Sequence, residues 1–494
     1  MDARFRRVDR DQQYLLPPDV REWLPVGHPA LFLVELIESL DLSAFVARSA
    51  TSRDRGRPAY HPTVMVGIAL YASMTATMSS RRIERALATD VGFRVVAANE
   101  RPDHVTICRF ITRHRDLLED LFAQVVGLAA EAGLIDVTLV ALDGTKLPGD
   151  ASPSRNQRLG DLRSRFAGWA DDVEANDDAE DAAEAADPDG GPIEEMFERD
   201  SMRDWIRRRL RERADEPDDR NMNVTDPDSG LVPRSGGGWV QGYNAQAAAV
   251  AGGIVVAADV TANPADTTML APMVGRIGAA VTAATGQSAG AVVADAGYWV
   301  TDVIEDIEAD DALPDVLIAT GRHTPEQQPE PLPEPDLTDY HAAVAAHDAA
   351  VAAERARRIA VIARVVNGEL LLREAAELLD LSVPHIGGIK LAWQAGDGEA
   401  AVGNPQLDGR RRPQPPKGPT RAARSRHAMD TRLAKPAGRS LYRQRQAIIE
   451  PVFGDIKTNR RITRFLRRGH DAVRAEWHWI LTGHNLTILH RRTG

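Results

Sequence analysis

The sequence predicts an α/β protein. A mixed sheet with flanking helices follows an all-helical amino-terminal region, and a helical insertion interrupts it near the carboxyl end. Three observations predict this architecture. Apolar residues recur with helical spacing early in the chain, short β-branched apolar runs alternate with helical stretches in the middle, and an Ala-rich helical stretch precedes the last segment.

The amino-terminal region has the periodicity of amphipathic helices. The stretches Ala30–Leu40 and Thr63–Tyr71 are clear examples, and prolines such as Pro58 and Pro62 mark the boundaries between helical runs. We therefore predict a helical domain over residues 1–135.

Five apolar runs predict the strands of the sheet, with a helix over Thr267–Ala284 between the third and the fourth. The predicted strands are Val137–Leu142, Tyr243–Val250, Ile254–Val260, Ala291–Ala294 and Val316–Ala319. A further helix opens within the stretch GYWVTDVIEDIEADD, before the last strand. This order is typical of a ribonuclease-H-like mixed sheet, in which early strands are antiparallel and later ones parallel. We assign residues 136–325 to the first part of this domain and residues 421–494 to its last part.

An acidic, Ala-rich block covers Trp169–Asp200. Such a composition cannot bury a core, so it predicts a solvated or disordered insertion over about residues 150–220. Because the block lies between the first and second predicted strands, it should protrude from the sheet without breaking it.

A second insertion covers residues 326–420 and begins with a Pro-rich stretch. Within residues 367–394, a helix, a short turn and a second helix starting at Val383 have the pattern of a helix-turn-helix. In that interpretation His385 and Lys390 face a DNA groove. The alternative is a structural helical hairpin, because Gly387 and Gly388 would weaken a recognition helix by roughly 1 kcal/mol each. A basic linker over residues 403–419 closes the insertion.

Charge is unevenly distributed along the chain. The net charge is -12, yet Arg and Lys greatly outnumber acids from about Arg410 to the end. A basic surface of this kind gathers phosphates by counterion release, so it indicates a nucleic-acid partner. The single Cys108 excludes an internal disulfide and fits a reducing cytosol. No apolar run reaches the roughly 20 residues of a membrane helix, and the start of the chain lacks a signal-peptide core, so no membrane partner is expected.

Three acids are candidates for catalysis. Asp143 follows a predicted strand in LDGTK, Asp295 follows another in ADAGY, and Glu450 lies among cations in YRQRQAIIEPVFGDIK. Two strands that each deliver an Asp at the carboxyl end, with a later helix that delivers a Glu, can build a two-metal phosphoryl-transfer site. Each Asp could instead cap a turn after its strand. Pro451, directly after Glu450, predicts an end or a kink of the helix there.

These residues resemble the DDE transposases of bacterial insertion sequences, in the group marked by a Tyr-Arg-Glu-Lys signature. The matching positions are Asp143, Asp295, Tyr442, Arg445, Glu450 and Lys457. Further similar segments are GRPAYHP, SSRRIERA, PDHVTICRF, NVTDPDSG, QGYNAQ and EWHWILTGHNL. One departure concerns the signature, whose commonest form has three residues between Arg and Glu where this chain has four. On an α-helix the extra residue rotates Arg445 by about 100° relative to the acid.

The resemblance implies an enzyme that cuts DNA at the ends of its insertion sequence and joins the freed 3′ ends to target DNA. It implies two Mg²⁺ (or Mn²⁺) ions held by Asp143, Asp295 and Glu450. Tyr442 would lie near the cut strand, although it could simply pack on the sheet. The cations expected to contact phosphate are Arg445, Lys457 and Lys146, which could otherwise be solvated surface charges.

The resemblance also implies the partners and the setting of the protein. The partners are double-stranded DNA, both terminal inverted repeats and target, and a second copy of the chain bound on that DNA. The amino-terminal domain would bind the ends of the element, and the protein would act in the bacterial cytoplasm at the nucleoid.

Two other functions remain open. The chain could be a catalytically inactive or domesticated transposase-derived DNA-binding protein, or a metal-dependent phosphodiesterase acting on small substrates. Asp226 and Asp228 in NVTDPDSG could add charge near the site, but an Asp-rich turn is the simpler interpretation. His104 and His484 match no zinc spacing and are expected to make structural hydrogen bonds.

Overall fold

The computed structural model describes residues 19–50, 59–167, 194–234, 237–321, 329–403, 405–406 and 411–493. The chain divides into two compact units, one comprising Met1–Pro329 with Ala428–Gly494 and the other comprising Glu330–His427. Within the described ranges, no helix is both long enough and apolar enough to span a bilayer.

The first unit begins with short helices. Their bounds are η1 Val20–Trp23, α1 Pro29–Ile37, α2 Ser43–Ala50, α3 Pro62–Met74, α4 Ser80–Thr89, α5 Val91–Val96, α6 His104–Arg113 and α7 Leu117–Glu131. Proline at the first helical position and side-chain caps start two of them, since His28 accepts from Ala30 N and His61 accepts from Thr63 N. These helices share one hydrophobic core with the sheet that follows.

The sheet is mixed, and its early strands are antiparallel. β1 (Leu139–Pro148) pairs antiparallel with β5 (Trp239–Val250), which also pairs antiparallel with β4 (Gly230–Pro233) and β6 (Val255–Thr261). On its other edge β1 runs parallel to β7 (Ala291–Ala294), and β7 runs parallel to β8 (Asp315–Ile318). This mixed arrangement is compatible with a ribonuclease-H-like domain.

Strand β1 extends six residues beyond the predicted end at Leu142. The pairing with β5 continues to Pro148, whereas the parallel pairing with β7 stops at Ala141. Asp143 therefore lies inside the strand, and its Asp-Gly pair forms no turn. Gly144 instead permits a close approach, because a Cβ there would lie 2.4 Å from Gln246 Nε2 and 2.7 Å from Asp266 Oδ1.

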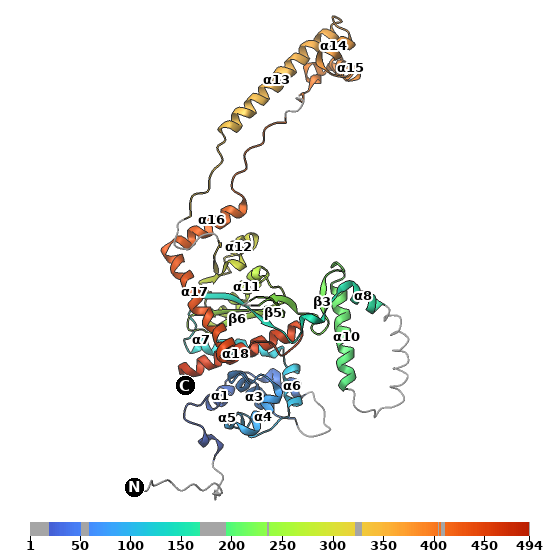
Figure 1. The fold of residues 1–494 in the computed structure, drawn as a ribbon. Helices are drawn as coiled ribbons and strands as arrows, with labels where there is room; N and C mark the ends of the chain where they lie inside the picture. Colours follow the sequence, from blue (N-terminus) through green and yellow to red (C-terminus); the bar gives the residue numbers. More distant parts are fainter. Residues whose placement is uncertain are drawn as a thin grey trace, which may run out of the picture. The chain divides into compact units, whose positions relative to one another are not determined.

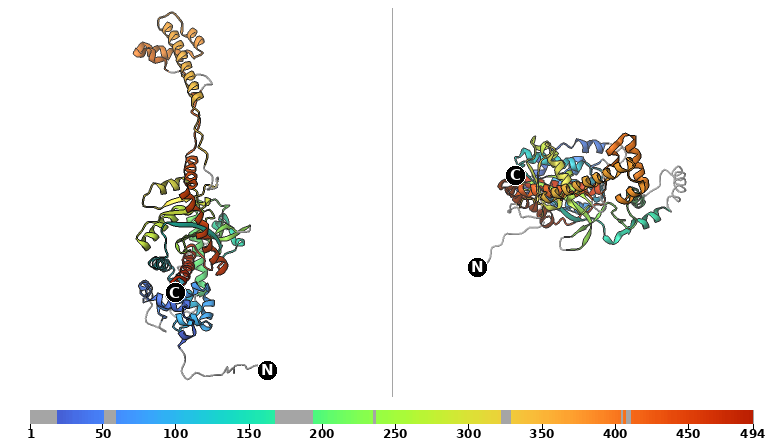
Figure 2. Two further views of the ribbon diagram at one scale, coloured as in Figure 1. Left: turned by 90° about the vertical axis from the view of Figure 1, so that its left-hand side faces the viewer. Right: turned by 90° about the horizontal axis from the view of Figure 1, so that it is seen from above.

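Helices cover the sheet and connect its strands. Their bounds are η3 Asp266–Met269, α11 Leu270–Thr285, η4 Ala296–Tyr298, α12 Thr301–Glu308, α16 Arg421–Ala434, α17 Pro436–Gly454, η7 Asp455–Asn459 and α18 His470–Thr493. The red α17 packs on β1, β5 and β7, and α18 packs on α3, α7 and β6 (Figures 1 and 2). Trp477 and Trp479 of α18 are buried and donate hydrogen bonds to the backbone carbonyls of Gln246 and Ala69.

Helix α17 does not end at Pro451 but continues through it to Gly454. Proline removes the donor to the carbonyl of the residue four positions earlier. Here that residue is Ala447, which is exposed, so water can satisfy the carbonyl. Glu450 and Lys457 consequently lie on one continuous helical run, of which the last turn, η7, is a π-helix.

The segment over residues 150–220 has secondary structure of its own in its described parts. These are η2 Pro153–Arg155, β2 Asn156–Arg158, α8 Leu159–Ala167, α10 Glu194–Glu212 and β3 Asn221–Asn223. A small core of Leu159, Leu162, Ile206, Leu210 and Met222 holds the helices together. Helix α8 therefore precedes the acidic block and α10 begins within it at Glu194, whereas residues 169–193 of the block lie outside the described residues.

The second unit is helical. It contains α13 Thr338–Val366, α14 Leu372–Leu379, α15 Val383–Ala392, η5 Trp393–Asp397 and η6 Gly398–Val402 around its own core. Asp380, with φ of 50°, forms the turn between α14 and α15. On α15, His385 is exposed and Lys390 is half-buried. The helix pair has the predicted pattern, and it fits a DNA-reading motif and a structural hairpin alike.

Candidate active site

Two of the predicted acids lie at one end of the parallel strand pair. Asp143 is two residues beyond Ala141, where β1 leaves β7, and Asp295 directly follows β7. Because neighbouring parallel strands end on the same edge, the two carboxylates are close to each other. Burial raises the pKa of Asp143, and the charge of Asp295 raises it further.

Arg445 of α17 is the direct partner of Asp143. Its Nη1 donates to Asp143 Oδ2 at 3.0 Å, and the two side chains are only 12% and 21% exposed. Burial lowers the pKa of Arg445, but the charges of Asp143, Tyr442 and Asp295 outweigh it and raise the pKa overall. For Asp143, burial outweighs the charge of the guanidinium, so the pKa of this carboxyl is raised. The pair thus spans a desolvated part of the site.

Tyr442 lies one helical turn before Arg445 and faces the same acids. Burial raises the pKa of its hydroxyl, Arg445 lowers it, and the carboxylates of Asp295 and Asp143 raise it again. The structure therefore brings Asp143, Asp295, Tyr442 and Arg445 together from β1, β7 and α17.

A second polar group lies beside this cluster and was not anticipated from the sequence. Asp266 of η3 accepts two hydrogen bonds from Lys146 Nζ, at 2.9 and 3.0 Å, and one each from Asn244 at 2.7 Å and Gln246 at 2.9 Å. Burial lowers the pKa of Lys457, and the charge of Lys146 lowers it further. The two lysines are therefore near each other.

The position of Asp266 relative to the acids follows from Gly297. A Cβ at Gly297 would lie 2.9 Å from Asp295 Oδ1 and 3.3 Å from Asp266 Oδ2. The phenol of Tyr298 donates to Gln246, joining this group to η4. One sequence signal existed: Asn244 and Gln246 are alternate polar residues in an otherwise Ala-rich strand, so they share one face of β5.

Glu450 is placed differently from the other two acids. It is exposed and forms no hydrogen bond or ion pair with the described residues. On a regular helix a residue four positions after Arg445 would be rotated by about 40°, whereas the fifth is rotated by about 140°. The extra residue of the signature thus separates Glu450 from the side of α17 that faces Asp143. Across the described residues, no three His, Cys, Asp or Glu side chains form a group able to hold a metal ion.

The donor set of the site nevertheless fits a divalent cation. Asp143 and Asp295 supply carboxylate oxygens, which Mg²⁺ prefers. The guanidinium of Arg445 rests against Asp143, which shows that this carboxylate accommodates a positive charge on its Oδ2. Its Nε is buried without a hydrogen-bond partner among the described residues, so the contact is incomplete.

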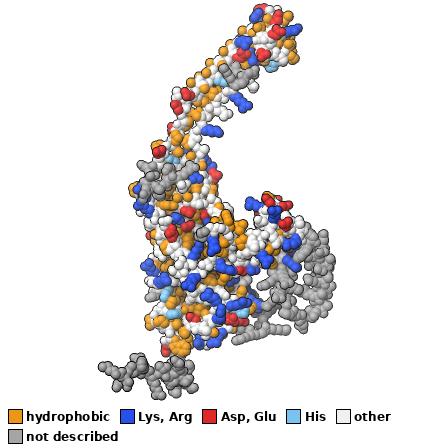
Figure 3. Space-filling view, viewed as in Figure 1, with side chains coloured by type: hydrophobic (Ala, Val, Ile, Leu, Met, Phe, Trp, Pro, Cys, Tyr) orange, Lys and Arg blue, Asp and Glu red, His pale blue; other side chains and the backbone are white. Residues whose placement is uncertain are grey.

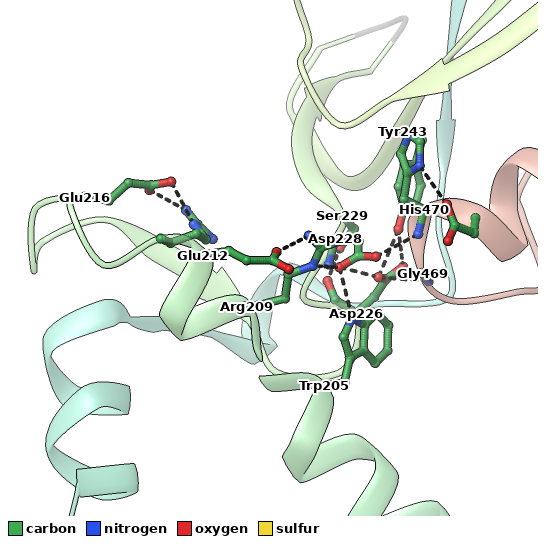
Figure 4. Close-up of polar contacts among 12 residues, drawn as sticks. Trp205, Arg209, Glu212, Glu216, Asp226, Asp228, Ser229, Tyr243, Gly469 and His470 are labelled. Carbon is green, nitrogen blue, oxygen red and sulfur yellow. Dashed lines mark hydrogen bonds and ion pairs between the residues drawn. The ribbon is translucent and has the colours of Figure 1, made fainter. Parts of the chain in front are cut away.

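Asp226 and Asp228 belong to a separate network, drawn in Figure 4. Tyr243 OH lies 2.9 Å from both carboxylate oxygens of Asp226, and Gly469 N donates to Asp226 at 3.2 Å. Asp228 accepts from Trp205 Nε1 at 3.0 Å, from His470 N at 2.9 Å and from Arg209. This network fastens α10 to β5 and to the start of α18, so these acids have structural partners.

The histidines singled out in the sequence also have structural partners. His104 Nδ1 lies 3.0 Å from Glu84 Oε2. His484 Nδ1 lies 3.0 Å from Asp455 Oδ2, and its Nε2 lies 3.0 Å from the carbonyl of Gly253.

Two models of known families match the sequence of the chain. A model of the transposase DDE domain matches residues 218–486, which is more than half of the chain, and a model of a transposase domain (DUF772) matches residues 18–113. The chain therefore belongs to the transposases that carry this DDE domain. Members of the family act on DNA and generally use divalent metal ions. Neither the curated proteins nor the solved structures contain a match to the chain.

Proposed function

We propose that the chain is the transposase of a bacterial insertion sequence of the Tyr-Arg-Glu-Lys group, and that it cuts DNA at the ends of that element and joins the freed 3′ ends to target DNA. One observation carries this proposal. Asp143 and Asp295 meet at the adjoining ends of two parallel strands and face Tyr442 and Arg445 of one helix.

Asp143, Asp295 and Glu450 are the residues proposed to hold two Mg²⁺ or Mn²⁺ ions. Bound ions would lower the pKa of the attacking hydroxyl and neutralise charge developing on the phosphate. Glu450 can join the two aspartates only if α17 turns or shifts on the sheet, because it now lies about 140° from Arg445 around the helix. The π-turn at Asp455–Asn459 is a place where such a shift can be absorbed.

Arg445 changes partners in this proposal. Before DNA binds, it neutralises the buried carboxylate of Asp143. A turn of α17 that brings Glu450 inward would carry the guanidinium away from Asp143. Arg445 would then be available to orient a phosphate of the bound strand, for which its planar donor set is suited.

Lys146 and Lys457 are proposed to hold the scissile strand. They are close enough for the charge of one to lower the pKa of the other, so an anion placed beside them would relieve that repulsion. Tyr442 would pack against the same strand near the cut.

The remaining parts of the chain fit this function. We assign residues 1–135 to binding of the terminal inverted repeats and residues 136–325 and 421–494 to the catalytic domain. The insertion over residues 326–420 would add DNA contacts if α15 reads a groove. Two ends must be cut in concert, so the active species is proposed to be a homodimer on DNA, in the bacterial cytoplasm.

A cleavage assay tests the proposal. The full chain is incubated with Mg²⁺ or Mn²⁺ and DNA that carries the inverted repeats flanking its reading frame. We expect metal-dependent nicks at the repeat ends with the wild type and with Asp311→Asn, an exposed control. Asp143→Asn and Asp295→Asn should bind the DNA without cutting it. Cleavage that persists in either variant would contradict the assigned site.

One observation favours the alternative of a catalytically inactive, transposase-derived DNA-binding protein. Glu450 is exposed and forms no metal-holding group with the two aspartates in the described part of the chain, and Arg445 is paired with Asp143. If this alternative holds, the wild type binds end-containing DNA but leaves it intact at every metal concentration.

A further inference from the structure

A cleft rich in arginine lies between the amino-terminal helices and the segment that follows α17. Its volume is about 730 Å³. One wall comprises the end of α3, the turn after it and Arg82 of α4, and the other comprises residues 459–464 and parts of α18, including Arg491. The cleft thus joins the two regions that match transposase families.

The acids of the cleft form their hydrogen bonds with groups other than its arginine side chains. Glu476 is buried and accepts the backbone N–H groups of Leu466 and Arg467 at 3.0–3.1 Å. Asp455 is held by His484 at 3.0 Å and by Asn459 at 3.2 Å. Both carboxylates therefore hold together the carboxyl-terminal wall of the cleft.

The arginines of the cleft fall into two sets. Arg460 is fixed by the backbone carbonyls of Ser73 and Ile480, and Arg464 pairs with Asp150. By contrast, Arg82, Arg461 and Arg491 are exposed and form no ion pair with any described residue. Three unpaired guanidinium groups around one concave surface repel one another, so an anionic partner would stabilise the cleft.

Two backbone features point the same way. Arg461 has φ of 56°, a left-handed conformation that costs a non-glycine residue free energy and is often kept where function requires it. Ser79 at the start of α4 makes no capping hydrogen bond, and Arg82 lies in the first helical turn, where the helix dipole disfavours a cation. A bound phosphate would offset the charge of Arg82 and the uncapped start of α4.

We propose that this arginine cleft binds the sugar–phosphate backbone of the DNA duplex. The proposal rests on DNA being the substrate of the proposed function. Arg461 follows Lys457 by four residues, so a duplex in the cleft can continue toward the proposed site. On the face seen in Figure 3, further Lys and Arg side chains gather around α18 and the amino-terminal helices.

Binding experiments test the cleft separately from catalysis. The full chain without metal is titrated with a labelled duplex of arbitrary sequence over a range of salt concentrations. We expect the triple variant Arg82→Ala, Arg461→Gly, Arg491→Ala to bind about 10-fold to 1000-fold more weakly, and the slope of log affinity against log salt to fall by about 2 to 3. Glycine at 461 accepts the positive φ, so this change preserves the backbone.

A neighbouring pair provides the matched control. Arg81 and Arg82 are both exposed on α4, but only Arg82 lines the cleft. Arg82→Ala should lower the salt slope by about one, and Arg81→Ala should leave it unchanged. Equal effects of the two substitutions, or an unchanged affinity of the triple variant, would overturn the proposal that the cleft binds DNA.

The outcomes also separate the cleft from the proposed function. If the protein cuts end DNA but the cleft substitutions leave its DNA affinity unchanged, only the proposal for the cleft is contradicted. If the cleft substitutions weaken DNA binding but the wild type never cuts DNA, the proposal for the cleft is supported and the catalytic proposal is contradicted. A wild type without affinity for duplex DNA would overturn both.

Discussion

Two carboxylate clusters of the first unit, Asp226 with Asp228 and Asp143 with Asp295, differ in how many donors surround each acid. Asp226 and Asp228 together accept from Tyr243, Trp205, Arg209 and the backbone N–H groups of 469 and 470 (Figure 4). Asp143 accepts from Arg445 and from Gly144 N, and the described donor to Asp295 is Gly297 N. An ionised carboxylate offers about four acceptor sites.

The difference distinguishes a structural acid from a candidate catalytic one. In the Asp226 network the protein itself supplies about three donors to each carboxylate, so little acceptor capacity remains for a ligand. In the Asp143 cluster the carboxylates are partly buried yet keep unused lone pairs, which is a costly arrangement unless a ligand completes it.

The largest effect is expected from Asp143→Asn, which keeps the shape of the side chain and removes its charge. If Asp143 holds the catalytic ions, the rate of DNA cleavage should fall by at least about 1000-fold. The free energy of unfolding should stay the same or rise, because burial penalises the ionised form of Asp143. Cleavage kinetics and urea unfolding of the same preparation provide the two measurements. A large loss of stability would assign Asp143 to the structural class.

The opposite result is expected for Arg209→Ala. Asp228, whose side chain is 7% exposed, would lose a charged partner while remaining buried. The free energy of unfolding should fall by about 2–4 kcal/mol, and cleavage below the unfolding transition should change little. Arg207→Ala on the same helix is the control, since Arg207 pairs with the exposed Asp204 and should cost less than about 1 kcal/mol. Equal losses in the two variants would remove the distinction.

A pH-dependent effect is expected at Asp226. Burial raises its pKa to about 6. A carboxyl whose folded pKa lies above its unfolded value binds its proton more tightly in the folded state, so its contribution to stability is present below about pH 4 and is lost as the pH rises to about 6. Relative to Asp226→Asn, the free energy of unfolding of the wild type should fall by up to about 3 kcal/mol as the pH rises over this range. Asp215→Asn, at an exposed position, should show no such difference.

The smallest and most discriminating effect concerns Asp266. It lies beside Asp295, yet Lys146, Asn244 and Gln246 supply it with as many donors as the structural acids have. Donor count therefore predicts that Asp266→Asn costs about 1–2 kcal/mol of unfolding free energy and reduces cleavage far less than Asp143→Asn does. A loss of cleavage equal to that of Asp143→Asn, at unchanged stability, would show that proximity matters more than donor count.

Much of the fold was predictable because its signals are local. The strand Ala291–Ala294 was predicted with its observed bounds, and β5, β6 and β8 differ from their predicted bounds by one to four residues at an end. Strand β4 of the same sheet was not predicted. The largest difference, the end of β1, arose because the apolar run stops at an acid followed by glycine, a pattern that predicts the end of a strand. The structure shows that the long antiparallel partner β5 extends the strand and that Gly144 is needed for a close contact with the polar network.

The candidate site was predictable only in part. Asp143 and Asp295 follow apolar runs that mark strands, so their common edge could be expected from parallel strand order. Asp266 was missed because it follows a turn-rich stretch without periodicity, and its partner Lys146 is 120 residues away. The position of Glu450 depends on helical phase, and the one-residue departure in the signature signalled it.

The sequence by itself determined which segments are helices and strands, which acids follow the strands, and where charge accumulates, since hydrophobic period and composition are properties of neighbouring residues. Tertiary structure alone decided which polar groups meet. Arg445 donates a hydrogen bond to Asp143, 302 residues away in the sequence, and Gly469 N donates one to Asp226, 243 residues away. Such contacts depend on strand register and helix rotation, where a shift of one residue changes the partner of every side chain.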